Sequence, residues 1–259
     1  MGGLAALAVF AAVGGAAVAW LPSDSARTSA ALTPVESPTH RETAGAPERE
    51  ETAESPEPEQ SGTPSGPATT PLPENGPGTF VTAPGRSGRV GKGTPLRYRV
   101  EVEKGITLSP EDVAAQVERT LADPRGWTAD GHSAFQRVDG GPTDFVVRLA
   151  TPGTVDRVCA EGGLDTGGKV NCSVNHQVMV NVRRWVLATE FYREDVVGYR
   201  SLIINHEVGH FLGHGHVTCP GEGQPAPAMM QQIKGLHGCV PNVWPYDSDG
   251  RLLTGPSAP

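Results

Sequence analysis

The sequence predicts an α+β fold in which strands form a sheet that packs against a long buried helix. Residues 96–103 and 177–184 alternate apolar and polar side chains, as half-buried strands do. Residues 109–123 repeat apolar side chains at helical spacing after a Ser-Pro start. Residues 194–212 form a second helical stretch that is apolar enough to be buried and carries two histidines four residues apart.

The first residues of the chain have the composition of a targeting segment. Residues 2–21 are uncharged and almost wholly apolar, and about twenty such residues suffice to span a bilayer as a helix. The segment also contains an A-x-A pattern at residues 17–19, which fits a signal-peptidase site. We therefore expect residues 1–21 to be a signal peptide or a membrane anchor helix, and in both cases the remainder is exported.

Residues 22–76 are rich in Pro, Glu, Ser and Thr and contain no aromatic residue and no cysteine. Such a segment cannot bury enough apolar surface to offset its chain entropy, which predicts a disordered linker. It holds ten acidic and three basic residues, so it carries −7 of the net charge of −8. The rest of the chain is nearly neutral and shows no nucleic-acid footprint. We expect a folded domain at 77–246 and a flexible tail at 247–259.

The first predicted elements of the domain are a strand and a helix. Residues 96–103 alternate as a half-exposed strand. Ser109 is a good N-cap, Pro110 suits the first helical position, and Asp123 with Pro124 ends the helix. The side chains expected to face the core are Val113, Val117 and Leu121.

Two further strands are predicted at 133–138 and 143–149. The residues between them are Asp-Gly-Gly-Pro, which favours a tight turn. We expect these two strands to pair as a hairpin.

The segment before the second long helix is less regular. Residues 154–161 are predicted to form a short helix, and the glycine-rich residues 162–175 a loop. Residues 177–184 alternate valines with other side chains, which predicts a strand with one face on the core.

The second long helix is predicted to begin after two acidic residues and to end at Leu212. Glu194 and Asp195 place negative charge at its N-terminus, where the helix dipole favours it. Its apolar residues are numerous enough to bury it: Val197, Ile203, Ile204, Val208, Phe211 and Leu212. A packed helix holds functional side chains more precisely than a loop does.

This helix carries the candidate metal ligands. His206 and His210 share one helix face and can bind one metal ion, for which Zn²⁺ is the natural choice. A catalytic zinc site needs three protein ligands and leaves one position for water, so Glu207 is better placed as the general base. Gly213 favours a left-handed helix end, which would turn His216 back as the third ligand.

Two other third ligands are conceivable. His214 continues the four-residue series, but it requires the helix to run on through glycines, which are poor helix formers. Glu222 is the only glutamate after Glu207, yet it lies in a Pro/Gly-rich loop. Both are weaker candidates than His216.

Four cysteines lie in the predicted domain, and export favours disulfides. Three pairings are formally possible. We predict Cys159–Cys172 and Cys219–Cys239, because each bond closes a short loop around an irregular segment. The alternative, a second zinc site built from thiolates, lacks the usual C-x-x-C spacing.

Residues 206–216 match the pattern His-Glu-x-x-His-x-x-Gly-x-x-His at every fixed position, so the chain resembles the metzincin-type zinc metallopeptidases. The run from Cys219 to Pro245 also looks like an actinobacterial family of exported metzincin-like domains. A looser likeness is to the snapalysin-type proteases, which have Asp where this chain has His216. The resemblance implies a metzincin-like zincin fold, with a twisted mixed sheet packed on the ligand helix, and Zn²⁺ as cofactor.

The same resemblance implies a methionine turn beneath the metal ligands, here bounded by Cys219 and Cys239. Met229 and Met230 are both candidates for it. Neither methionine is followed two residues later by a tyrosine, so the resemblance supplies no tyrosine at that place.

These observations predict an exported or membrane-tethered zinc metalloendopeptidase that hydrolyses peptide bonds in a peptide or protein substrate. We expect a monomer without a nucleic-acid partner. The alternative is a catalytically inactive, zinc-containing binding domain at the cell surface. The intact Glu207 favours the enzyme, since a structural zinc site needs no adjacent glutamate.

Overall fold

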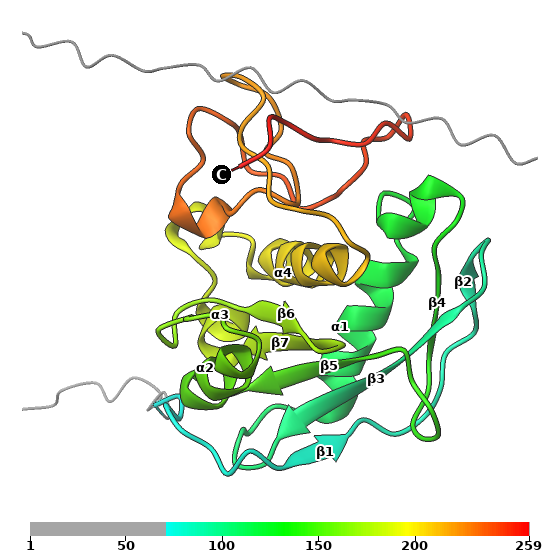
Figure 1. The fold of residues 1–259 in the computed structure, drawn as a ribbon, viewed down its shortest axis with the longest axis vertical. Helices are drawn as coiled ribbons and strands as arrows, with labels where there is room; N and C mark the ends of the chain where they lie inside the picture. The colour runs from blue at the N-terminus through cyan, green and yellow to red at the C-terminus, as the bar shows by residue number, and fades with distance from the viewer. Residues whose placement is uncertain (1–70, 259) are drawn as a thin grey trace, which may run out of the picture. The chain divides into compact units, whose positions relative to one another are not determined.

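The computed structural model describes residues 71–258, which form a mixed α+β unit (Figure 1). The α-helices in this range are α1 (Pro110–Ala122), α2 (Pro152–Glu161), α3 (Val182–Leu187) and α4 (Val196–Phe211). The strands are β1 (Phe80–Thr82), β2 (Val90–Gly91), β3 (Leu96–Glu103), β4 (Ala134–Arg137), β5 (Phe145–Ala150), β6 (Cys172–Val174) and β7 (Gln177–Asn181). Short 3-10 helices are η1 (Trp127–Asp130), η2 (Glu190–Tyr192) and η3 (Gln232–Lys234). The predicted α+β class is confirmed.

The described strands join in one sheet, in the order β2-β4-β3-β5-β7-β6, with β1 paired to the far end of β3. β4, β3, β5 and β7 run parallel to one another, whereas β1, β2 and β6 pair antiparallel with their neighbours. The sheet is therefore mixed, as the family resemblance implies. β6 lies at one edge of it, beside β7.

The predicted hairpin between residues 133–138 and 143–149 is wrong. Both strands exist, as β4 and β5, but they lie on opposite edges of β3 and parallel to it, with Tyr98 opposite Arg137 on one side and Phe145 on the other. β5 is almost wholly buried on both faces, which suits an interior strand of a parallel sheet better than a hairpin.

The prediction that β3 is half-exposed is also wrong. Its last four residues are buried on both faces. Glu103 is only 1% exposed, and its carboxylate accepts hydrogen bonds from Thr151 N at 2.8 Å and Thr154 Oγ1 at 2.6 Å. On the same face, Glu101 accepts a bond from Arg148 Nε at 2.8 Å. The polar side chains of β3 are thus satisfied inside the protein rather than by water.

The helix predicted after Ser109 is confirmed as α1. The Ser109 hydroxyl accepts a hydrogen bond from Asp112 N at 3.1 Å, and Pro110 opens the first turn. The three residues predicted to face the core are all buried: Val113, Val117 and Leu121. Their burial attaches α1 to the sheet and to α4.

The segment between β5 and α4 differs from prediction in two places. The short helix is confirmed as α2, but the predicted loop at 162–175 also contains β6, an edge strand too short to show periodicity. The strand predicted at 177–184 stops at Asn181. The Asn181 side chain accepts a hydrogen bond from Arg183 N at 2.9 Å, and this cap starts α3 where a longer strand was expected.

Helices cover the two faces of the sheet unequally. The inward side chains of β3, β5 and β7 form the main core with α1 and α4, while Met179 on the opposite face of β7 packs in a smaller core with α2. α4 lies between the sheet and the orange-to-red C-terminal segment (Figure 1). One side of α4 is therefore buried on the sheet, and the other is free to line a site.

Both predicted disulfides are present. Cys159–Cys172 joins α2 to β6, and Cys219–Cys239 joins two points of the irregular segment that follows α4. Residues 247–258, expected as a tail, lie against this segment: Thr218 N donates to Pro256 O at 2.8 Å, and Ala258 N to His216 O at 3.0 Å.

The predicted targeting segment at 1–21 and most of the predicted linker lie outside the described residues. Residues 71–76, assigned above to the linker, pack on the domain, where Gly153 N donates to Glu74 O at 2.9 Å. Between residues 71 and 258 we find no helix with the length and apolar character needed to cross a membrane.

Candidate metal centre

The site is built on the face of α4 that turns away from the sheet. Asp195 caps the helix by accepting a hydrogen bond from Gly198 N at 2.8 Å. Ile203, Ile204 and Val208 are buried as predicted, but Val197 is wrongly predicted and is 56% exposed, because it lies in the first turn beyond the core. α4 is therefore a core helix, and the imidazoles that it carries have a fixed backbone.

The expected left-handed turn follows α4 at Gly213. Gly213 has φ +93°, its N–H donates to His210 O at 3.0 Å, and His214 N donates to Gly209 O at 2.9 Å. This pair of bonds is the Schellman motif, which satisfies the last carbonyls of a helix and reverses the chain. The reversal brings His216 back beside α4.

The structure brings the three predicted histidines together. His206 Nε2 lies 3.2 Å from both His210 Nε2 and His216 Nε2, and the latter two atoms are 3.0 Å apart. Among the described residues this is the single group of three or more side chains that could hold a metal ion.

The other ring nitrogens fix the orientation of two of these imidazoles. His206 Nδ1 lies 2.8 Å from Ala228 O, and His210 Nδ1 lies 2.9 Å from His214 O. Because a carbonyl only accepts hydrogen bonds, each Nδ1 carries the proton and each Nε2 keeps its lone pair. Partners of this kind hold metal-binding histidines in their ligating tautomer.

Burial keeps the imidazoles neutral. It lowers the pKa of His206 to about 3, and the neighbouring His210 adds to this shift. Burial also lowers the pKa of His210 and that of His216. Neutral imidazole is the form that binds metal, so protons compete weakly for this site at neutral pH.

The three nitrogens fit a tetrahedral zinc ion. Zn–N bonds of about 2.0–2.1 Å in tetrahedral geometry separate the ligand atoms by about 3.3 Å, close to the spacing seen here. Because the Nε2 lone pairs of His206 and His210 point toward the same place, a cation there would be attracted to both. The donor set, three imidazoles and no thiolate, is also that of an open zinc site.

Glu207 lies in the same cavity as the histidines and is only 5% exposed. Its Oε2 atom is buried without a hydrogen-bond partner among the described residues. Burial raises the pKa of this carboxyl to about 8. A cation nearby would favour the carboxylate and oppose this shift, so Glu207 is suited to take up and release a proton near neutral pH.

The cavity has a volume of about 390 Å³ and three walls. One is α4, which contributes residues from Tyr199 to His210. The second comes from the loop after α2 and from the edge strand β6, between Leu164 and Ser173. The third consists of residues 230–233, which begin at the second of the two methionine-turn candidates. A ligand in the cavity would therefore touch the histidines and two segments distant in sequence.

The two methionines occupy different places. Met229 belongs to the main core and packs on α4 at Gly209, where a Cβ atom would clash with its sulfur and would lie 2.6 Å from Trp127 Cζ2. Met230 belongs to a separate cluster with Ala226 and Cys239 and lines the cavity. Met229 is thus the methionine that supports α4.

The rival ligands do not join the cluster. The His214 ring stacks on Trp127, with centroids 4.3 Å apart and planes inclined by 16°. Glu222 is absent from the group of described residues that could hold a metal. Trp127 was not foreseen from sequence, yet its Nε1 donates to Asn205 O at 2.8 Å and braces α4 beside His206.

Sequence reasoning also missed the second wall of the cavity. Residues 162–175 were expected as a loop without a role, although Leu164, Val170 and Ser173 line the site. The signal that could have indicated this was the predicted disulfide, because it ties the loop to the elements on both sides. The Ala228 carbonyl had no signal in the sequence at all.

Comparisons with known proteins add a family and no activity. No curated protein and no solved structure matches the chain. A family model described as "Protein of unknown function (DUF3152)" matches residues 64–247, which is more than half of the 259 residues and includes every candidate site residue. The chain belongs to the DUF3152 family.

Proposed function

We propose that this domain is a metzincin-like, zinc-dependent metalloendopeptidase. The observation that carries the proposal is one cavity in which three imidazole nitrogens lie 3.0–3.2 Å apart and a buried glutamate has an unpartnered oxygen. Metal ligation alone would explain the histidines, but it leaves the buried Glu207 without a purpose.

His206, His210 and His216 would hold the ion. Zinc bound there would act as a Lewis acid and would lower the pKa of the attacking water toward about 7. Glu207 takes a proton from the attacking water and passes it to the leaving amine. The raised pKa of its carboxyl before metal binding suits a group that must hold a proton between these two steps.

The surroundings support the metzincin likeness. The Schellman turn at Gly213 brings in the third histidine, and Met229 packs on the ligand helix inside the segment bounded by Cys219 and Cys239. β6 is an antiparallel edge strand whose Ser173 lines the cavity. An extended peptide could add to such an edge and place its backbone beside the metal.

The proposal includes an exported setting, as a secreted or membrane-anchored protein. Two disulfides within one domain support it, since such bonds persist in oxidising compartments. Recovery of the native protein from the cytoplasm with reduced cysteines would contradict this part alone.

The test uses the full chain. Purified wild-type protein should contain about one zinc ion per chain and should cleave a diverse peptide library. Glu207→Gln should keep the zinc and lose cleavage by a factor of about 10²–10⁴, the usual contribution of a general base. Zinc without cleavage above the variant would favour the inactive binding domain, and absence of zinc would refute both functions.

A further inference from the structure

The cavity wall formed by residues 164–171 is held in place by a disulfide and by hydrogen bonds rather than by apolar packing. In this loop only Thr166 is buried, and Leu164 is 45% exposed. A loop with so little apolar burial cannot derive a fixed shape from hydrophobic packing. Its conformation must therefore come from covalent and polar attachments.

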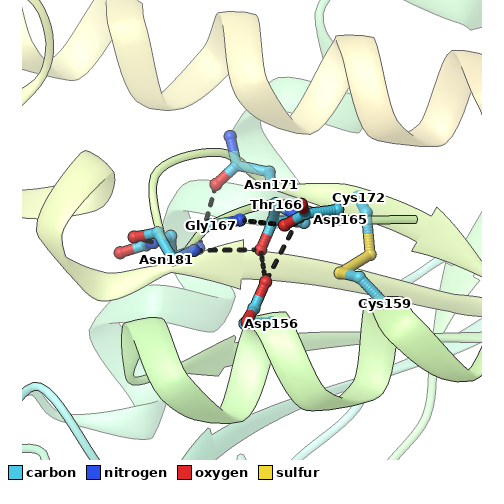
Figure 2. Close-up of a disulfide and its surroundings, with 9 residues drawn as sticks. Asp156, Cys159, Asp165, Thr166, Gly167, Asn171, Cys172 and Asn181 are labelled. Atoms are coloured by element: carbon cyan, nitrogen blue, oxygen red, sulfur yellow. Dashed lines mark hydrogen bonds between the residues drawn. A yellow bond between two sulfur atoms is a disulfide. The ribbon is translucent and has the colours of Figure 1, made fainter.

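Those attachments are present and specific (Figure 2). The disulfide Cys159–Cys172 closes the loop at its base. The Asp156 carboxylate on α2 accepts bonds from Thr166 Oγ1 at 2.7 Å and Thr166 N at 3.2 Å. Asn181 holds the second half, since its side chain donates to Gly168 O at 2.9 Å.

None of these attachments comes from the candidate metal centre. They arise from α2 and from the end of β7, whereas the histidines belong to α4 and to the turn that follows it. In Figure 2, Asp156 and Cys159 lie on α2, and the other labelled residues lie to one side of this helix. The loop can therefore change without altering the metal ligands.

The loop contributes two apolar residues to the cavity, Leu164 and Val170, together with the polar residues Asp165, Thr166 and Asn171. Leu202 and Ile203 line the cavity from α4, one turn before His206. Two apolar surfaces thus border the same space beside the histidines. A leucine that is half-exposed at such a rim gains by being covered with another apolar group.

We propose that residues 164–171 are the specificity wall of the site, and that Leu164 and Val170 receive a large apolar side chain of a peptide, such as leucine or phenylalanine, against Leu202 and Ile203. The inference rests on the proposed peptidase function and names its substrate class. Leu164 is the specificity-determining residue that is easiest to test, because its exposure makes substitution tolerable to the fold.

The test measures binding in a Glu207→Gln background, where cleavage does not interfere. Short peptides that carry Leu, Phe, Ser or Asp at each position in turn are titrated by calorimetry against the full chain loaded with zinc. We expect one position at which Leu and Phe bind tightest. Leu164→Asp should weaken those two peptides about ten-fold, equivalent to about 1.4 kcal/mol, and leave the Ser peptide unchanged.

Leu187→Asp is the matched control. Leu187 is 59% exposed on α3 and does not line the cavity, so the same change of charge and polarity should leave every peptide affinity unchanged. Equal weakening by both variants, or the absence of any preference for apolar side chains, overturns the specificity wall.

The outcomes for the two proposals are separable. If the wild-type protein cleaves peptides but shows no apolar preference that depends on Leu164, the peptidase proposal stands and the specificity wall is refuted. If it binds apolar peptides in a Leu164-dependent way but cleaves none of them, the wall stands as a binding surface and the peptidase proposal is refuted.

Discussion

The cluster of His206, His210 and His216, called the metal end below, and the specificity wall border one cavity. Different interactions hold the two regions in place. At the metal end, α4 packs in the main core, a helix-ending turn returns His216, and backbone carbonyls orient His206 and His210. The wall is mostly exposed and depends on a disulfide and a few polar bonds. Under the proposed function, this difference places the chemistry on a packed scaffold and the selectivity on a loop that can vary.

Among the changes considered below, removal of one histidine ligand should lower the zinc affinity most. His216→Ala takes away one of three nitrogens and cannot be rescued by His214, whose ring is stacked on Trp127. Loss of an outer partner of a ligand typically costs 10–100-fold in metal affinity, so loss of the ligand itself should cost more than about 100-fold. Zinc content after dialysis measures this loss of affinity. Full zinc occupancy in the variant would show that His216 is not a ligand.

The two disulfides test whether the metal end and the wall are separable. Cys159→Ala with Cys172→Ala frees the wall and should weaken binding of apolar peptides while zinc content stays at about one per chain. Cys219→Ala with Cys239→Ala loosens the segment that carries the Ala228 carbonyl and should lower zinc affinity.

Each disulfide pair should also cost about 2–4 kcal/mol of unfolding free energy, from the loop that it closes. Urea denaturation measures that cost, and it allows binding to be compared under conditions where both variants are folded. If the two double cysteine variants change zinc affinity equally, the wall and the metal end are not structurally independent.

The metal end was largely predictable, and the wall was not, for physical reasons. All three histidines, Glu207 and Gly213 fall within residues 206–216, so helix periodicity and one glycine suffice to place them. The contact of His206 with Ala228 depends on tertiary packing across 22 residues and leaves no local pattern.

The wall depends on pairings that no periodicity reports. Thr166 bonds to Asp156 ten residues away, and β6 is only three residues long. The same limit explains the mistaken hairpin. β4 and β5 are neighbours in sequence, but they pair with opposite edges of β3, which therefore lies between them in the sheet. Local turn chemistry cannot reveal a strand inserted from earlier in the chain.

The pH dependence of the metal-free protein should also come from the metal end. Burial raises the pKa of Glu207 to about 8 from 4.5, so between pH 6.5 and 8 the folded state keeps a proton that the unfolded state has lost. Glu207 should therefore lower the stability by about 1–2 kcal/mol as pH rises through this window. The lowered pKa values of the histidines act in the opposite sense, because they lower the stability as pH falls through their unfolded-state value of 6.5, and they offset part of the Glu207 effect near that pH.

Urea unfolding of chelator-treated protein at pH 6.5 and 8 measures this slope. Glu207→Gln should remove the Glu207 contribution, because glutamine does not titrate, and the variant should no longer lose stability as pH rises through the window. The wall provides a contrast: hydrogen bonding to Thr166 lowers the pKa of Asp156, so this carboxylate is charged in both states throughout the window and adds no slope. An equal slope in the variant would assign the effect to other groups.

The smallest expected effect isolates the turn that links the helix to its third histidine. Gly213 and Gly215 both have open space where a Cβ atom would lie, but only Gly213 has a positive φ. Gly213→Ala should therefore cost about 1–2 kcal/mol, the strain of a left-handed residue with a Cβ, while Gly215→Ala should be close to neutral. Because the strain is relieved by shifting His216, zinc affinity should fall in the first variant only. Equal zinc affinity in both would mean that the core and the carbonyl contacts, rather than the turn, fix the third ligand.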